Sequence, residues 1–598
     1  MTHTLRRAVL PLALLALAAL AARPAHAEEI FPLDQIKPGM KGTARTIFAG
    51  KKIESFDLEV IGVLRNLIGP KQDVILVRLL GEKTAYTGVV AGMSGSPVYI
   101  EGKLVGALAY RFGAFTREPI AGVTPIESML RAAQEPTPPQ NVAALGRYPL
   151  PEETSTALGL GHLPDQYLVP IETPLSFVGI HPRVVSHFSE ELGRLGLLAL
   201  QGGGTAVPEN TSELLPGGAV AAALVTGDMG IAGTCTITHR IGNQLFACGH
   251  PLLSYGDVQL PMARAEIVTT VASELSSFKI ANLGELVGTF RQDRRSAIVG
   301  EVGPIPAMIP VDLTVAHRGR ERQYHYQIFQ HPKLSPTLLN LTLFNGLFTL
   351  IESGEGLTYR VSGQMSLRGH ESIVLDDMFG PTESPFPDAL LVAGSVGQTF
   401  RRIFSNPFET PEIERITLRV ELLPERRAVS IENAWVDKND VRPGETIRVK
   451  VILRPYRGPR LVREISIEIP PQAAKGNLRV LVSDALLLNR ITRTMQLSFG
   501  LRLGRQLAPR VSSLEQLIAL INRERRNDRL YVSLFQRTPT LLVEDKVLPS
   551  IPLSQMNVLN PRQTPGRTIV SYQSILNESS QPLGQVITGS RWLQVTVR

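Results

Sequence analysis

Short apolar runs separated by glycine and proline turns dominate the N-terminal part of this chain of 598 residues. The runs Phe56–Leu64 and Val74–Leu80 have the length of β-strands and are short for helices. We therefore predict a β-barrel half over residues 28–135. The Pro-rich stretch Glu135–Gln140 marks its end and is typical of a linker.

The same pattern of short β-prone runs returns further along the chain. Residues 215–320 predict a second barrel half. Between the two halves, residues 136–214 are expected to form the Pro-rich linker and a small helical segment. In that segment Val184, Phe188 and Leu192 lie at helical spacing, so we expect a helix that packs by this face.

Strand-like sequence continues to the C-terminus. Residues 321–425 predict a β-rich domain. Residues 426–505 predict an Ig-like β-sandwich, because Thr446–Val451 alternates polar and apolar residues after a Pro-Gly turn. Residues 506–598 combine a helical segment with strand-like sequence and predict a C-terminal α+β module. The expectation is a mainly β protein.

One turn in the first barrel half carries candidate chemistry. In the sequence GMSGSP at residues 92–97, glycine lies on both sides of Ser94, so the backbone can turn sharply and expose the hydroxyl. The amides of Gly92 and Ser94 can then point to one place and form an oxyanion hole. The β-prone runs Val98–Ile100 and Leu104–Ala109 follow and predict a hairpin.

A second turn supplies a candidate base. The runs Gly233–Thr238 and Gln244–Ala247 predict two strands, and the second leads into a Gly-His-Pro corner at His250. Of the 11 histidines in the chain, only His250 combines a strand end with a preceding glycine and a following proline. An imidazole held there can take the proton of a serine hydroxyl and return it to a leaving amine.

The serine turn and its hairpin resemble those of the chymotrypsin-like peptidases. This resemblance runs from Ser94 to Arg111 without a gap. It implies that Ala109, Tyr110 and Arg111 bind the backbone of a peptide substrate, which would add a strand to the sheet.

The wider pattern is similar to that of the SpoIVB-type serine peptidases, through both turns, PGMKG at residues 38–42 and VGTF at residues 287–290. In that family the histidine segment precedes the serine turn, whereas here Ser94 comes first, so we interpret the chain as a circularly permuted member. The resemblance implies a two-barrel chymotrypsin-like peptidase domain. It also implies a serine endopeptidase that makes limited regulatory cleavages in envelope proteins.

The third member of the catalytic triad stays open. The family's acid lies shortly before the serine turn, and the corresponding residues 78–81 contain no carboxylate. The other candidates are Asp73, Glu82, Asp257 and Asp293. Among them we favour Asp293. A Ser-Lys pair that uses Lys279 is an alternative mechanism, and a catalytically inactive scaffold with a peptidase fold is an alternative function.

Cys235 and Cys248 are the only cysteines, and a hairpin that turns near Gly242 would place them opposite one another. A disulfide between them and a pair of buried thiols are both open. The sequence lacks the closely spaced cysteine and histidine pairs of zinc sites, so neither a metal nor a cofactor is expected.

The N-terminus predicts export. Residues 1–27 contain Arg6 and Arg7, an apolar run to Ala22, and Ala-His-Ala as a cleavage site, which is typical of a signal peptide. We therefore expect a periplasmic or extracellular protein. No later stretch has the roughly 20 apolar residues of a transmembrane helix.

Charge says little about partners, because 62 basic and 54 acidic side chains give a net charge of only +8. Basic clusters such as Arg523–Arg526 contain an acid and no aromatic residue, so nucleic acid is not an expected partner. The expected partner is a protein or peptide substrate. The C-terminal β-modules are the expected binding surface for an envelope protein.

Overall fold

The computed structural model describes residues 29–113, 118–134, 146–152, 156, 167–194, 196–202, 213–350, 356–382, 388–502, 511–543, 546–549 and 567–598. The predicted signal peptide and the Pro-rich stretch at 135–140 lie outside these ranges. The chain forms two compact units. Unit 1 comprises the residues up to Val178, Ser189–Ala223 and Ile231–Pro306; unit 2 comprises Gly179–Phe188, Leu224–Gly230 and Ala307–Arg598.

The serine-bearing part of unit 1 is a closed barrel of six strands. Around the barrel, the strands follow the order β1 (Lys41–Ile47), β2 (Ile53–Gly69), β3 (Gln72–Leu80), β6 (Ile120–Pro125), β5 (Lys103–Phe112) and β4 (Pro97–Ile100), and β4 pairs with β1 to close the ring. The short helices η1 (Leu33–Gln35), α2 (Glu82–Thr87) and α3 (Ile126–Gln134) interrupt the strands. Two further strands, β8 (Tyr167–Pro170) and β7 (Tyr148–Pro149), extend the sheet from β5.

The histidine-bearing part of unit 1 contains a second ring of paired strands. Their order is β11 (Ala219–Gly227), β12 (Gly230–Ile241), β13 (Gln244–Ala247), β16 (Ala297–Val302), β15 (Phe278–Arg294) and β14 (Gly256–Val271), which pairs back to β11. Strands β9 (Thr173–Val178) and β10 (Leu197–Gln201) continue from β12. The predicted mainly β fold with two barrels is therefore confirmed.

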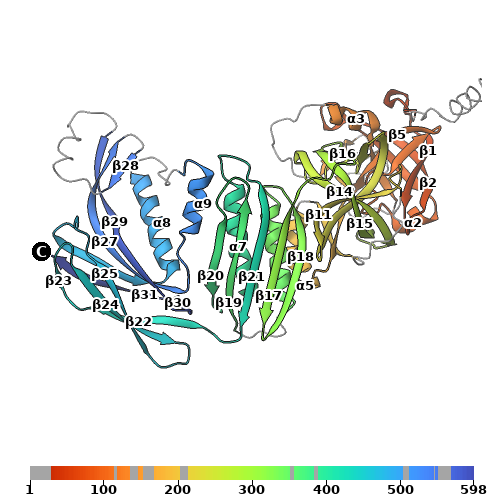
Figure 1. The fold of residues 1–598 in the computed structure, drawn as a ribbon. Coiled ribbons are helices and arrows are strands. Elements are labelled where there is room, and N and C mark those ends of the chain that lie inside the picture. Colours follow the sequence, from red (N-terminus) through yellow and green to blue (C-terminus); the bar gives the residue numbers. More distant parts are fainter. Residues whose placement is uncertain are drawn as a thin grey trace, which may run out of the picture. The chain divides into compact units, whose positions relative to one another are not determined.

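Unit 2 begins with a sheet covered by helices. Its strands follow the order β18 (Arg320–Phe329), β17 (Met308–His317), β21 (Ile413–Leu423), β19 (Thr358–Leu367) and β20 (Ile373–Phe379), and the last residues of β11 pair with β18. In Figure 1 these strands form a green array with α7 (Asp388–Phe404) beside it. Helix α7 contacts α6 (Ser335–Phe348), and α5 (Pro182–Gly193) forms where the helical spacing predicts it. The first unit ends at Pro306. Residue 320, where the sequence pattern places the end of the second barrel half, lies in the β17–β18 hairpin of unit 2.

The C-terminal part of unit 2 is a β-sandwich. One sheet contains β22 (Ala428–Val436), β24 (Thr446–Pro455), β25 (Leu461–Glu468) and β30 (Val586–Thr588). The other contains β23 (Asp440–Val441), β31 (Ser590–Val597), β26 (Gly476–Ser483), β27 (Arg529–Val543), β28 (Lys546–Pro549) and β29 (Arg567–Pro582). A single apolar core joins both sheets, so each side of the sandwich is buried against the other.

The sandwich takes strands from both of the segments 426–505 and 506–598 that the sequence separates. Helices α8 (Ala485–Arg502) and α9 (Leu514–Asn522) lie between its strands in the sequence. The Ig-like assignment stays a prediction. Among the described residues, no helix is both long and apolar enough to span a membrane.

Candidate active site

The serine turn is held between the two barrels of unit 1. Gly92 and Gly95 both have positive φ, +94° and +93°, which glycine adopts without strain. A Cβ on Gly95 would lie 1.9 Å from the carbonyl oxygen of Thr236, so no other residue fits there. The Ser94 carbonyl accepts a 2.8 Å hydrogen bond from the amide of Thr236, and the Gly92 carbonyl accepts one of 3.1 Å from its hydroxyl. Strand β12 therefore fixes the turn from the other barrel.

The amides of the turn divide into two groups. Those of Met93, Gly95 and Ser96 donate hydrogen bonds to backbone carbonyls at 2.7 to 3.0 Å. The described residues offer no hydrogen-bond acceptor to the amides of Gly92 and Ser94. These are the two amides that the sequence assigns to an oxyanion hole, and they are available to a ligand oxygen.

The histidine corner follows β13 and is fixed on both sides. A disulfide joins Cys248 to Cys235 of β12, with Cα atoms 5.3 Å apart. The Gly249 carbonyl accepts a 2.6 Å hydrogen bond from the hydroxyl of Thr124 in β6. A Cβ on Gly249 would lie 3.1 Å from the Cβ of Ala109, so the corner approaches β5 closely. The open question about the cysteines is thus answered by a disulfide.

The two turns also contact each other. The position of a Cβ on Gly95 lies 2.5 Å from the amide nitrogen of Cys248. Leu108 of β5 contacts both turns. Its carbonyl oxygen accepts a 2.7 Å hydrogen bond from the Gly95 amide and lies 3.3 Å from the position that a Cβ on Gly249 would take. The fold therefore brings together residues 94 and 250, which are far apart in the sequence.

The contacts of His250 define its protonation. Its Nδ1 lies 2.8 Å from the carbonyl oxygen of Pro251. Because a carbonyl can only accept, this hydrogen bond requires the proton on Nδ1 and leaves the lone pair on Nε2. Burial lowers the pKa of His250 to about 4, and the backbone groups of Pro251 and Ile171 oppose the shift in part. The imidazole is therefore neutral near pH 7, as a general base must be.

The reactive atoms are buried and have no partner. Ser94 has 0% and His250 2% of its surface exposed. Neither Ser94 Oγ nor His250 Nε2 has a hydrogen-bond partner among the described residues, so the two are not bonded to one another in this state. Hydrogen bonds between catalytic groups are often long or misaligned in free enzymes and tighten when substrate binds.

The predicted role of Asp293 is not the one that the structure gives it. Its carboxylate accepts hydrogen bonds of 2.7, 2.8 and 3.2 Å from the amides of Leu252, Leu253 and Tyr255. It therefore holds the loop that follows His250 and does not contact the imidazole, whose Nδ1 is taken by Pro251. Burial raises the pKa of Asp293, and the backbone amides oppose this. Asp293 is a positioning residue.

The other candidate acids do not orient His250 either. Asp73 pairs with Arg65 at 2.7 Å, and Asp257 pairs with Arg294 at 3.0 Å. Glu82 is an exposed residue in the first turn of α2. The Nδ1 atom of His250, which binds the acid in a catalytic triad, is here bound by a backbone carbonyl.

Lys279, the alternative base, lies close to the serine turn. Its side chain would contact a Cβ on Gly92 at 3.3 Å, and its Nζ donates a 2.7 Å hydrogen bond to the hydroxyl of Thr46. Burial lowers the pKa of Lys279 to about 7. The Lys279 amine thus hydrogen-bonds to Thr46, and the aliphatic part of its side chain packs next to Gly92 of the turn.

The strand assigned to substrate is covered on both edges. In β5, Tyr110 and Arg111 pair with β6 on one side and with Pro170 and Val169 of β8 on the other. Ala109 accepts a 2.9 Å hydrogen bond from the amide of Ile171. The edge that the sequence analysis gives to a peptide is thus occupied by the chain itself.

Sequence reasoning missed Thr124 and Thr236, whose hydroxyls fix the two turns. Both are threonines in strands, a setting where threonine is common, so their sequence context carries no signal. The segment from Tyr167 to Ile171 was also missed, because it pairs with β5 from a distant part of the sequence.

One other cluster has the composition of a metal site. In unit 2, His370 Nε2 lies 3.0 Å from Glu409, and Nδ1 lies 3.4 Å from Glu515. The two carboxylates contact different nitrogens of the ring, so the cluster is built as ion pairs. The chemistry at Ser94 does not involve it.

Two barrels with a serine turn and a histidine corner between them form a domain of chymotrypsin-like architecture. The family model of the SpoIVB peptidase S55 family matches residues 22–130. This segment contains Ser94 and not His250, so the circular permutation stays a prediction. No curated protein and no solved structure matches the chain. The match indicates a serine peptidase.

Proposed function

We propose that the protein is a serine endopeptidase in which Ser94 is the nucleophile and His250 the general base. The observation that carries the proposal is a serine hydroxyl and an imidazole nitrogen in two turns that contact each other, both buried and both without a hydrogen-bond partner in the described part of the chain. An unpartnered buried polar atom costs free energy, on the order of 1–3 kcal/mol, so such a pair is expected where function requires it.

The chemistry follows from the contacts. Ser94 Oγ attacks the peptide carbonyl carbon while His250 Nε2 takes its proton. The amides of Gly92 and Ser94 donate to the oxyanion. The Pro251 carbonyl holds the Nδ1 proton and stabilises the imidazolium. His250 then protonates the leaving amine, the carbon–nitrogen bond breaks, and water hydrolyses the acyl enzyme by the same route.

The wider role rests on the sequence. We propose export through residues 1–27, limited cleavage of envelope proteins, and recruitment of those proteins by the C-terminal sandwich. N-terminal sequencing of the exported protein tests the first part, with a mature start near Glu28 expected.

The test of activity is cleavage of an unfolded protein substrate, with the product termini read by mass spectrometry. The intact protein should produce new termini, and Ser94→Ala and His250→Ala should not. His239→Gln is the matched control, because His239 lies in the neighbouring strand β12 and is also buried. Cleavage that survives Ser94→Ala would refute the proposal. Binding of the substrate without cleavage by the intact protein would favour the scaffold alternative.

A further inference from the structure

The short strand β8 lies where a bound peptide is expected. It runs antiparallel to β5, with Arg111 opposite Val169 and Tyr110 opposite Pro170. Two backbone hydrogen bonds frame this pairing, both 2.9 Å long, from Ile171 to the carbonyl of Ala109 and from Gly113 to the carbonyl of Tyr167. This is the geometry by which a peptide adds a strand to a sheet edge.

The end of this segment lies beside the reactive groups. Ala109, which accepts the amide of Ile171, lies next to Gly249 of the histidine corner. The backbone of Ile171 is also close enough to His250 to raise its pKa, although His250 Nε2 makes no hydrogen bond with it. Ile171 is therefore the end of the segment Tyr167–Ile171 that lies toward His250.

The side chain of Ile171 fills an apolar site next to the serine turn. It is 1% exposed and belongs to the same core cluster as Met93 of the turn and Val90, which precedes the turn.

Few contacts hold the segment. β8 has only the residues Tyr167–Pro170, and its other edge pairs with the two-residue strand β7. Leu168 is buried, and Glu172 pairs with Arg111 at 2.7 Å and accepts from Ser276 at 3.0 Å. A peptide that makes the same hydrogen bonds and buries the same apolar side chains can therefore replace this short strand.

We propose that a peptide binds along the edge of β5 that pairs with β8, and that Tyr167–Ile171 occupies this edge as an internal competitor. The preferred substrate is then an extended segment with an aliphatic residue at the place of Ile171. That the bound peptide is a substrate rests on the proposed function, whereas binding of the peptide to β5 does not depend on catalysis. A competitor lowers the apparent affinity of a ligand by the fraction of molecules in which the site is free.

The test uses the Ser94→Ala protein, which cannot cleave, and a fluorescent peptide with the sequence YLVPIET of residues 167–173. Anisotropy should show binding at least tenfold tighter after Leu168→Ala and Glu172→Gln are added to weaken β8. A peptide with aspartate at the isoleucine position is the matched control and should bind at least tenfold more weakly than the original. Equal affinity for the weakened and unweakened proteins would overturn the proposal.

A second measurement does not use the weakened protein, so a folding defect in that protein cannot affect the result. Hydrogen exchange of Ser94→Ala alone should show faster exchange at the Ile171 amide when the peptide is in excess, and unchanged exchange in β6. No change at Ile171 with the peptide bound would overturn the proposal. Fluorophosphonate labelling of Ser94 in the otherwise intact protein reports on catalysis separately, so failure of the peptidase and failure of the competitor give different results.

Discussion

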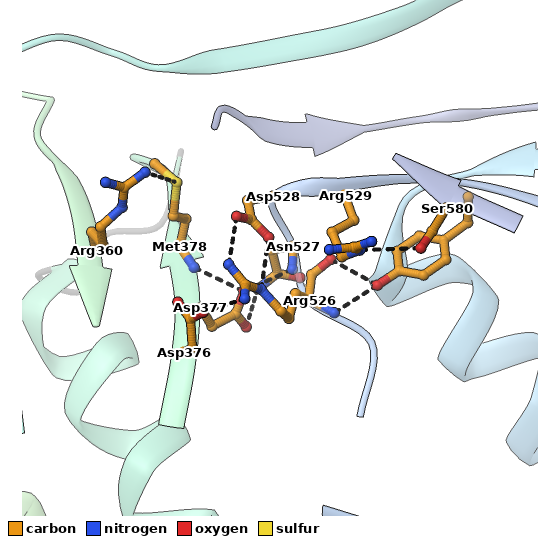
Figure 2. A network of polar contacts seen from close by, with 10 residues as sticks. Arg360, Asp376, Asp377, Met378, Arg526, Asn527, Asp528, Arg529 and Ser580 are labelled. Carbon is orange, nitrogen blue, oxygen red and sulfur yellow. Dashed lines mark hydrogen bonds and ion pairs between the residues drawn. The ribbon is translucent and has the colours of Figure 1, made fainter. Parts of the chain in front are cut away.

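Two polar clusters, one in each unit, differ in how their polar atoms are partnered. In unit 2, Arg526 binds Asp528 with two hydrogen bonds of 3.0 and 2.8 Å, and it also contacts Asp376 (Figure 2). Asp377 beside it accepts from the amide and side chain of Asn527 at 2.7 and 3.0 Å. In unit 1, Ser94 Oγ and His250 Nε2 have no hydrogen-bond partner among the residues that the structure describes.

The difference distinguishes a network that stabilises the fold from a site that can bind another molecule. The Arg526 cluster joins strand β20 to the segment before β27, and its charges face each other in pairs, as Figure 2 shows. Burial raises the pKa of Asp377 to about 6, although hydrogen bonds from Asn527 and Met378 oppose the shift. Such a network stabilises a fold. A site with unfilled hydrogen bonds is instead prepared for a group that arrives from outside.

The largest expected effect is on reactivity in unit 1. His250→Ala should lower the rate of fluorophosphonate labelling of Ser94 about 10²- to 10⁴-fold, because general-base catalysis contributes that much. Arg526→Ala should leave the rate unchanged. Labelling followed by intact-protein mass spectrometry measures both, and an equal loss in the two variants would remove the distinction between the clusters.

For stability, we expect the larger effect from the change in the Arg526 cluster. Arg526→Ala leaves buried Asp528 without its partner and should lower the free energy of unfolding of unit 2 by about 2 kcal/mol, less than for a fully buried pair because Arg526 is 32% exposed. Ser94→Ala should change the unfolding of unit 1 by less than about 0.5 kcal/mol, since it breaks no hydrogen bond. Denaturant titration with calorimetry as a second probe measures this. A larger loss for Ser94→Ala would mean that its hydroxyl has a structural partner.

The disulfide should matter more for stability than any single contact of the histidine corner. Cys235 and Cys248 are separated by 13 positions, and closing a loop of that size stabilises by about 3 kcal/mol. The double variant Cys235→Ser and Cys248→Ser should lose about that much and should also label more slowly. A reductant titration on the intact protein checks the same point. Unchanged unfolding would show that the bond is dispensable.

Asp293→Asn should have a smaller effect, about 1–3 kcal/mol, because a side-chain amide keeps one acceptor oxygen for the three backbone donors. The control is Asp257→Asn, since Asp257 is 64% exposed and pairs at the surface. Both are compared by urea unfolding. A direct role of Asp293 as the triad acid would instead show as a large loss of labelling at unchanged stability.

The smallest expected effect is on pH dependence. The neutral imidazole is the base, and burial lowers the pKa of His250 to about 4, so the labelling rate should be flat from pH 8 to 5.5 and fall to half near pH 4. An ordinary histidine would give a midpoint near 6.5. Circular dichroism at each pH confirms that the protein is folded. A midpoint near 6.5 would show that His250 is solvated in the working enzyme.

The sequence predicts the two barrels and the catalytic pair because both signals are local. The turns at Ser94 and His250 need glycine at fixed neighbours, and short β-prone runs surround them. Contacts between distant segments carry no such signal. The role of Asp293 depends on amides about 40 positions away, and β31 pairs with β26 across more than 100 residues to complete the sandwich. Nothing in residues 167–171 marks them as the neighbour of β5.

The central claim is that Ser94 and His250 form a working pair whose imidazole is oriented by a backbone carbonyl. The most direct measurement is the location of a fluorophosphonate adduct by peptide mass spectrometry. We expect an adduct on Ser94 in the intact protein, faster adduct formation after Leu168→Ala and Glu172→Gln, and adduct formation about 10²- to 10⁴-fold slower after His250→Ala. No adduct on Ser94 in folded protein, with and without the changes in β8, would contradict it.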